Sequence, residues 1–283
     1  MRFTKMNGAG NDFIILNNMD RHIPADRFPE IARILCRRRL SVGADGLMAV
    51  EPAVQGGDFQ MLFYNADGSQ GEMCGNGARC ICRYGFEHGL AGEIQTVDSP
   101  SGPVRGQRID KRTYRIRLTD PTVTRLSCSV DVCGQTWPCA YVELGDPGLP
   151  HCAVFYPGLA DCTAGQLREL GCAFRWNQAF PKGANVNFYD ITEPDHIRLL
   201  TYERGVEDFT YACGTGTGST VLALTLMGKV SGKNVAVTSP GGTLYVTVER
   251  TDGKTDLWLT GPTNLVCDGE AFDDDLRENT DIF

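Results

Sequence analysis

The sequence predicts an α+β protein made of two similar halves, in each of which a twisted sheet wraps around one central helix. Three observations support this class. Short β-branched or aromatic runs bounded by Gly, Asp, Asn or Pro recur along the chain, and helix-like runs are fewer. A Cys-Gly-x-Gly turn followed by an apolar, helix-like run occurs twice, at Cys74 and Cys213. These cysteines lie 139 positions apart in a chain of 283 residues, which fits an internal repeat.

The runs predict the elements in order. The segments with strand character are short, apolar and rich in β-branched or aromatic residues, and they are 13–17, 47–50, 59–64, 113–119, 140–144, 152–156, 185–190, 196–203, 234–239, 242–249 and 255–261. Helices are predicted in 27–39, after each Cys-Gly-x-Gly turn, and in 163–174, where Thr163 is a suitable N-cap.

The segment 119–127 contains Pro and polar residues, so it is interpreted as a domain boundary. We therefore expect an N-terminal domain of residues 1–120, to which residues 265–283 could return, and a C-terminal domain of residues 121–264. The last 16 residues are strongly acidic and are expected to form a solvated end.

Composition excludes several classes of protein. A net charge of −8 argues against a nucleic-acid partner, which would require a basic surface. No run approaches 18 apolar residues, and the first residues lack the apolar stretch of a signal peptide, so no membrane partner and a cytoplasmic location are expected. None of the twelve cysteines has the spacing of a zinc site, so no metal is expected and most should be small buried side chains.

The two cysteine turns combine a sulfur with an anion site. A helix N-terminus presents unpaired N–H groups and a partial positive charge, which should lower the pKa of the adjacent thiol and bind a carboxylate. Glycines allow the backbone to approach a ligand closely. If two such turns face each other, one sulfur can remove the α-proton of an amino acid as a base while the other returns a proton as an acid. The alternatives are a phosphate loop, for which the Lys of a P-loop is missing, or two packed core cysteines.

Five motifs then carry a resemblance over nearly the whole chain. They are KMNGAGNDF (5–13), FYNADGS (63–69), MCGNGARC (73–80), GANVNF (183–188) and YERGVEDFTYACGTGTGS (202–219). In this order they resemble the diaminopimelate epimerases, amino-acid epimerases that work without pyridoxal phosphate. The resemblance implies two pseudo-symmetric domains, an active site in the cleft between them, no cofactor, a small amino-acid substrate and a homodimer.

The resemblance also implies roles for individual residues. Cys74 and Cys213 would be the catalytic pair. The residues that would bind the substrate fall into three groups: Gly75, Asn76, Gly214 and Thr215 at the reacting carboxylate with Asn11 lining the same pocket, Glu203 at the reacting ammonium, and Asn65, Asn185 and Arg204 at the far end of the substrate.

The chain departs from the family in the segment before His151. His151 is expected near one catalytic cysteine in a supporting role, but the family's Asn is replaced by Asp146, and Gly148 and Leu149 look inserted. An Asp would disfavour a carboxylate at that place. A racemase for another amino acid therefore remains an alternative. A redox-sensing binding protein, in which Cys74 and Cys213 form a disulfide, is a further one.

Overall fold

The computed structural model describes residues 1–71 and 74–279. The chain divides into two compact units, which we call unit 1 (Met1–Ile116 with Gly261–Phe283) and unit 2 (Arg117–Thr260). It leaves unit 1 in strand β7 (Thr113–Arg117) and returns in β16 (Lys254–Pro262). The domain limits predicted from sequence lie four residues later at each crossing, and the division into two domains stays a prediction.

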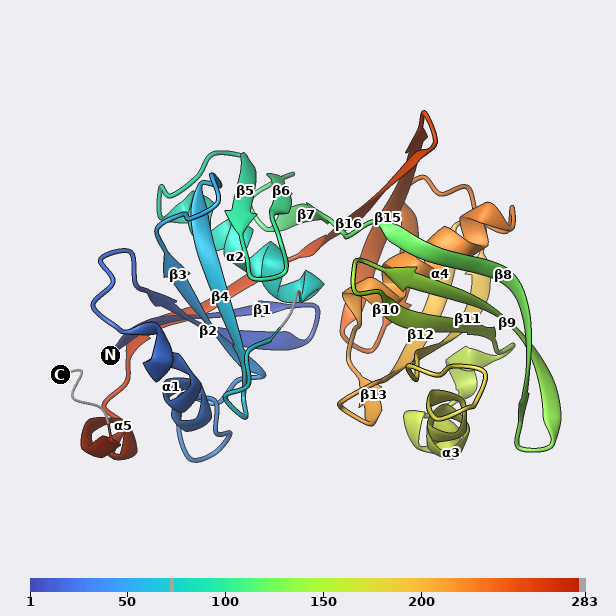
Figure 1. Cartoon of the computed structure of the whole chain (residues 1–283), viewed down its shortest axis with the longest axis horizontal. Coiled ribbons are helices and arrows are strands. Elements are labelled where there is room, and N and C mark those ends of the chain that lie inside the picture. The colour runs from blue at the N-terminus through green and yellow to red at the C-terminus, as the bar shows by residue number, and fades with distance from the viewer. Residues whose placement is uncertain (72–73, 280–283) are drawn as a thin grey trace. The chain divides into compact units, whose positions relative to one another are not determined.

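The described residues of unit 1 form a mixed sheet and three α-helices, and Figure 1 shows their arrangement. Besides β7 and the end of β16, its strands are β1 (Arg2–Gly8), β2 (Asn11–Asn17), β3 (Gly46–Glu51), β4 (Phe59–Asn65), β5 (Ile94–Asp98), β6 (Val104–Arg108) and β17 (Asn264–Glu270). Its helices are α1 (Phe28–Leu35), α2 (Gly75–Glu87) and α5 (Asp274–Asn279), with a short 3-10 turn at Ala25–Arg27.

Unit 2 contains the remaining elements. Its strands are β8 (Pro121–Val132), β9 (Gln135–Leu144), β10 (Leu149–Phe155), β11 (Asn185–Glu193), β12 (His196–Glu203), β13 (Asp208–Thr210), β14 (Val235–Ser239), β15 (Gly242–Thr251) and most of β16. Its helices are α3 (Ala164–Arg175) and α4 (Gly214–Leu226), with a 3-10 turn at Leu159–Asp161. The predicted cap of α3 is confirmed, because Thr163 and Gln166 form a reciprocal capping box.

The two units repeat one order of strand pairing. In unit 1, β1 lies antiparallel to β17 and β2, and the pairs β2–β3, β3–β4, β4–β5 and β5–β6 are parallel, antiparallel, parallel and antiparallel. In unit 2, β9 lies antiparallel to β8 and β10, and β10–β11, β11–β12, β12–β14 and β14–β15 follow the same alternation. The helices take equivalent places, α1 with α3 and α2 with α4. The predicted α+β class with two similar halves is confirmed.

In each unit the sheet separates an inner from an outer helix (Figure 1). Residues from Gly214 to Leu224 are buried all around α4, which packs on β8–β11 and β15, and residues from Gly75 to Gly85 are buried in α2. The outer helices contribute to separate clusters, with Phe28 and Ile31 of α1 in one and Leu167 and Phe174 of α3 in the other. Side chains that alternate along a strand therefore face the inner and outer helix in turn.

The structure adds detail to two sequence interpretations. The predicted boundary segment 119–127 begins just after the division between Ile116 and Arg117, and from Pro121 onward it forms the start of β8. This strand pairs with β9 although half of its side chains are exposed, and a strand tolerates proline at its first position. The acidic C-terminal segment is not simply solvated: β17 pairs with β1, and Ala271 and Leu276 are buried against the α1 cluster. Residues 280–283 of that segment lie outside the described residues.

The packing of α2 on β4 gives a test of the fold. A Cβ added at Gly85 would lie 2.4 Å from Cε1 of Phe59, which is fully buried and cannot move aside. We expect Gly85→Ala to lower the free energy of unfolding by roughly 2 kcal/mol, the usual cost of overpacking. In the control Gly165→Ala, at the start of α3, the new Cβ meets nothing closer than 3.9 Å, so stability should rise by up to about 1 kcal/mol. Urea unfolding of both variants makes the comparison; equal stabilities would contradict it.

Candidate active site

The two cysteine turns have the same backbone geometry. Cys74 has φ −109° and ψ 113°, and Cys213 has φ −109° and ψ 111°. Each is the N-cap of a 13-residue inner helix, and its carbonyl accepts the first helical hydrogen bond, from Ala78 N–H at 2.8 Å and from Thr217 N–H at 2.9 Å. Each sulfur is therefore carried at the positive end of a buried helix. Met73, the first residue of the MCGNGARC motif, lies outside the described residues.

The Cys213 thiol is buried beside a carboxylate. Its sulfur accepts a hydrogen bond from Gly216 N–H at 3.4 Å and lies 3.6 Å from Oγ1 of Thr215. Burial, and then the Glu203 carboxylate that hydrogen-bonds to it, raise the pKa of Cys213 well above the usual range of a thiol. The two helix-start donors lower the pKa, but they are outweighed. The expectation that the helix terminus favours a thiolate is wrong for Cys213, because desolvation and an adjacent negative charge are stronger than the helix field.

The start of α2 in unit 1 holds a buried cation. Arg79 is fully buried, and its guanidinium donates to Oδ1 of Asn76 at 2.7 Å and to the carbonyl of Gly75 at 3.2 Å. Burial lowers the pKa of Arg79 to about 10, and thiols nearby, Cys74 among them, oppose that shift. A guanidinium that reaches back to the first turn adds positive charge where the backbone N–H groups already attract an anion. Sequence reasoning missed Arg79, although an Arg within a buried helix is itself a signal.

Asn11 is fixed at the same place. Its Oδ1 accepts from Nδ2 of Asn76 at 2.6 Å, and its own Nδ2 donates to Asp45 at 3.1 Å. Arg38 in turn pairs with Asp45 at 2.7 Å and with Asp12 at 2.5 Å. Unit 1 therefore brings Asn11, Gly75 and Asn76 together around Cys74, as the motifs suggested, through a network of ion pairs that the motifs did not reveal.

Asn65 ends β4 and begins a tight turn. Its Nδ2 donates to Oγ of Ser69 at 2.9 Å, its carbonyl accepts from Gly68 N–H at 2.9 Å, and Gly68 has φ +82°, a conformation that suits glycine. Asn65 pairs with Gly46 across β3 and β4. Its half-buried side chain thus lies at the end of a core strand, held by the turn.

Asn185 and Arg204 are joined in unit 2. Oδ1 of Asn185 accepts from the backbone N–H of Arg204 at 2.9 Å, and its Nδ2 donates to the carbonyl of Pro150 at 3.0 Å. The Arg204 guanidinium donates to the carbonyl of Lys182 at 3.2 Å. Asn185 therefore shapes the loop after β12. Glu207, in the same loop, pairs with Arg175 at 3.0 Å.

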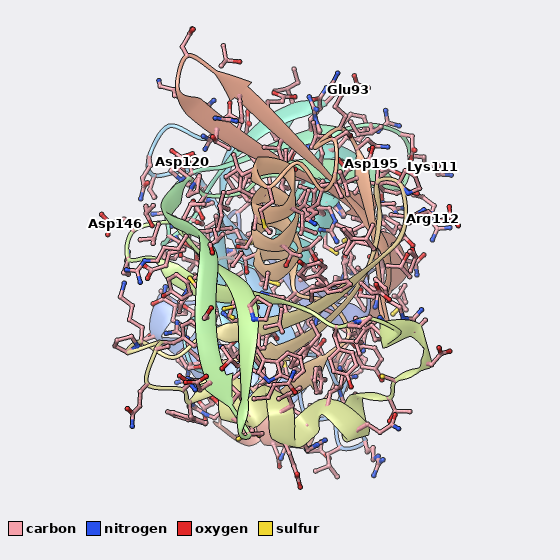
Figure 2. All side chains as sticks on the ribbon, turned by 90° about the vertical axis from the view of Figure 1, so that its right-hand side faces the viewer. Glu93, Lys111, Arg112, Asp120, Asp146 and Asp195 are labelled. Atoms are coloured by element: carbon pink, nitrogen blue, oxygen red, sulfur yellow. The ribbon has the colours of Figure 1, made fainter. Side chains whose placement is uncertain are left out.

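His151 and Asp146 occupy different environments. His151 is buried in β10, and burial together with the nearby Arg204 guanidinium lowers the pKa of His151 to about 3. Asp146 is exposed in the loop between β9 and β10, and its side chain points away from the ribbon (Figure 2). Gly148 packs closely on Glu143, since a Cβ there would lie 2.2 Å from Oε2 of that residue.

Two further searches cover the described residues only. In residues 1–71 and 74–279, no group of three or more His, Cys, Asp or Glu side chains is arranged to hold a metal ion. Within the same ranges, no helix has the length and apolar character needed to span a membrane.

A family model described as diaminopimelate epimerase matches residues 3–120 and 145–266, which include both cysteine turns and every candidate site residue. The chain belongs to the diaminopimelate epimerase family. It is accordingly an epimerase, an enzyme of the isomerase class, and the resemblance stated from sequence is confirmed. The residues between the two matched segments, 121–144, form β8 and β9.

Individual members of the diaminopimelate epimerase family match over almost their whole length. The chain is 33% identical to diaminopimelate epimerase of Picosynechococcus sp., covering 96% of this chain and 99% of that protein. It is 34% identical to the enzyme of Moorella thermoacetica and 35% identical to that of Desulforudis audaxviator, each over 95% of this chain and 99% of the relative.

Two solved structures share the fold of this chain at lower sequence identity. A probable proline racemase from Agrobacterium radiobacter superposes with a TM-score of 0.69 at 16% identity, covering 95% of this chain and 92% of the other. A hydroxyproline epimerase from Agrobacterium vitis, with bound trans-4-hydroxy-L-proline, gives 0.69 at 16% identity over 98% and 94%. At this identity the likeness shows the fold alone, and it agrees with the predicted class.

Proposed function

We propose that this enzyme interconverts L,L-diaminopimelate and meso-diaminopimelate by moving the α-proton between Cys74 and Cys213, without a cofactor. The observation that supports this most is the pair of cysteine N-caps with matching backbone angles, each on a buried helix. The names of the relatives support the substrate. The reaction would supply a precursor for lysine and for peptidoglycan.

The two sulfurs have different starting states in this proposal. Because burial, and then Glu203, raise the pKa of Cys213, Cys213 begins as the thiol and gives its proton to the substrate. Cys74 is the half-exposed partner, with the buried Arg79 cation nearby, so it begins as the thiolate and removes the α-proton. The reverse reaction exchanges these roles, and the two thiols titrate as a coupled pair.

Other residues would bind the substrate and hold it in place for the proton transfer. Backbone N–H groups of Gly75, Asn76, Gly214 and Thr215 would hold the reacting carboxylate and stabilise negative charge as the proton leaves. The Glu203 carboxylate would accept the reacting ammonium. Asn11 would line the same pocket, and Asn65, Asn185 and Arg204 would contact the far end of the substrate, where an Arg pairs well with a second carboxylate. Asp146 is exposed and is not proposed to contact the substrate.

The assembly is also a proposal. The proposed proton transfer requires a base on one face of the substrate α-carbon and an acid on the other. By family resemblance we propose a homodimer in the cytoplasm, with the small amino acid as the ligand and no nucleic-acid or membrane partner.

Proton exchange tests the proposed function directly. Reduced enzyme is incubated with L,L-diaminopimelate in D2O, and NMR follows the α-carbon. We expect meso product that carries deuterium at the inverted carbon, because a thiol in D2O returns solvent deuterium. If the substrate stays unchanged, the proposed reaction is wrong, and a panel of single L-amino acids analysed by chiral chromatography would then test the alternative of another racemase.

A further inference from the structure

Unit 2 carries a layer of polar side chains under the inner helix α4. His151 on β10 pairs with Asn185 on β11, and Asn187 pairs with Thr201 on β12. Their strand neighbours Cys152, Val186 and Leu200 belong to the cluster on the α3 side of the sheet, so these four alternate residues face α4. A Cβ at Gly216, in the first turn of α4, would lie 2.3 Å from Oδ1 of Asn187. The layer therefore lies directly against the helix that begins at Cys213.

Hydrogen bonds fix the orientation of Asn187 in this layer. Its Nδ2 lies 3.4 Å from the carbonyl of Cys152, which can only accept, and its Oδ1 accepts from Oγ1 of Thr201 at 3.0 Å. The same Nδ2 lies 3.4 Å from Nδ1 of His151. Because Nδ2 is a donor, Nδ1 of His151 is the acceptor, and a neutral ring then carries its proton on Nε2. Nε2 is buried and has no hydrogen-bond partner among the described residues.

Unit 1 shows that the fold itself does not need this polar layer. The register of β2, β3 and β4 places Phe13, Met48 and Phe63 where unit 2 has His151, Asn187 and Thr201. These three are buried and apolar, and Met48 packs on Gly77 of α2 as Asn187 packs on Gly216 of α4. The same three positions thus hold apolar side chains in unit 1 and hydrogen-bonded polar side chains in unit 2, where they lie under the helix that begins at Cys213.

Resting on the proposed function, we propose that Asn187 is a positioning residue that holds His151 as the neutral Nε2–H form, so that His151 donates a fixed hydrogen bond to the negative charge that develops on the substrate beside Cys213. The register that pairs Val186 with Tyr202 puts Asn185 beside Glu203, so His151, Asn185 and Glu203 form one row across three strands. Glu203 contacts the Cys213 thiol. His151, which carries the Nε2–H donor, therefore lies in the same row as Glu203, the residue that contacts the sulfur of Cys213.

The surroundings disfavour the rival role of His151 as a base. Glu203 lies in the same row as His151, and Arg204 follows it in the chain. Burial, and then the Arg204 cation, lower the pKa of His151 and keep the ring neutral. A ring whose Nδ1 is already an acceptor for Asn187, and whose Nε2 carries the proton, has no lone pair to offer to Cys213. A neutral histidine that acts as a donor is an established way to stabilise a developing anion.

The protonation of His151 can be measured without substrate. The chain has four histidines, and two of them, His22 and His196, are exposed controls. In a long-range ¹H–¹⁵N spectrum of protein labelled with ¹⁵N-histidine, we expect His151 to show a proton on Nε2, none on Nδ1, and no titration from pH 5 to 9. In Asn187→Asp the carboxylate accepts instead, so the proton should appear on Nδ1. A proton on Nδ1 in the wild type, or no change in the variant, would overturn the inference even if the enzyme epimerises diaminopimelate.

The activities of three variants then distinguish a hydrogen-bond donor role of His151 from a role as a base. The side-chain amide of Gln can donate near the place of Nε2 but cannot act as a base, so His151→Gln should keep kcat within about tenfold of wild type. His151→Ala and Asn187→Asp should lose about 100-fold, the usual effect of removing one fixed donor. If His151→Gln loses as much as His151→Ala while the NMR result stands, the ring position is right and the donor role is wrong. The spectra of His22 and His196 report whether each variant keeps its fold.

Discussion

Replacing either Cys74 or Cys213 by alanine is expected to abolish epimerisation, with kcat reduced by more than about 1,000-fold. Inversion at the α-carbon needs a base on one face and an acid on the other, and alanine removes one of them while leaving the helix N-termini intact. Because Cys and Ala differ by one sulfur atom, both variants should fold, with a cost of about 1 kcal/mol where the buried Cys213 sulfur is lost. The measurement is meso-diaminopimelate formation from the L,L isomer, with circular dichroism to check folding.

The matched control for the cysteine variants is Cys172→Ala. Cys172 is exposed on α3 and takes no part in the proposed reaction, so this variant should keep wild-type activity. Activity in only one of the two site variants would mean that a single cysteine serves both faces, which contradicts the two-base mechanism. Activity in both would remove the cysteines from the mechanism altogether and leave only the anion sites at the helix starts.

Much of this fold could be predicted from sequence because the core strands are strongly apolar. The runs at 47–50 and 152–156, for example, correspond to β3 and to the second half of β10, where most residues are buried. The strands at the edges of the sheets were harder to predict from sequence. β8 has a polar, exposed pattern and becomes a strand through pairing with β9, and β17 forms because the chain end returns to β1. Neither pairing has a local signal, since both depend on the partner strand.

The candidate site, too, could be predicted from sequence only in part. The two Cys-Gly-x-Gly turns were enough to predict that Cys74 and Cys213 each lie at the start of a helix, because glycines followed by an apolar run are a local sequence signal. The electrostatics could not be predicted, because the direction of the Cys213 pKa depends on burial and on Glu203, ten residues earlier in the chain. Nor could the role of Asn187 be inferred from the GANVNF motif, because it rests on the register of three strands and on a comparison with Met48 in the other unit.

Glu203→Gln is expected to have two measurable effects of opposite sign. The Glu203 carboxylate disfavours a negative charge on Cys213, so its loss should lower the pKa of that thiol, give more thiolate at a fixed pH, and accelerate alkylation of Cys213 by iodoacetamide at pH 8, by roughly tenfold. Turnover should fall in the same variant. An amide cannot neutralise the substrate ammonium, and losing a charge-assisted hydrogen bond should reduce kcat/KM by about 100-fold.

The two readouts decide what Glu203 does. Mass spectrometry of the peptide that contains Cys213 gives the alkylation rate free of the other eleven cysteines. The control is Glu193→Gln at the end of β11, where the side chain is 74% exposed and lies near His196, so neither quantity should change. Faster alkylation with an unchanged KM for diaminopimelate would mean that Glu203 acts on the thiol and does not bind the ammonium. Alkylation that is unchanged or slower would contradict the electrostatic account, because burial alone would then keep Cys213 protonated.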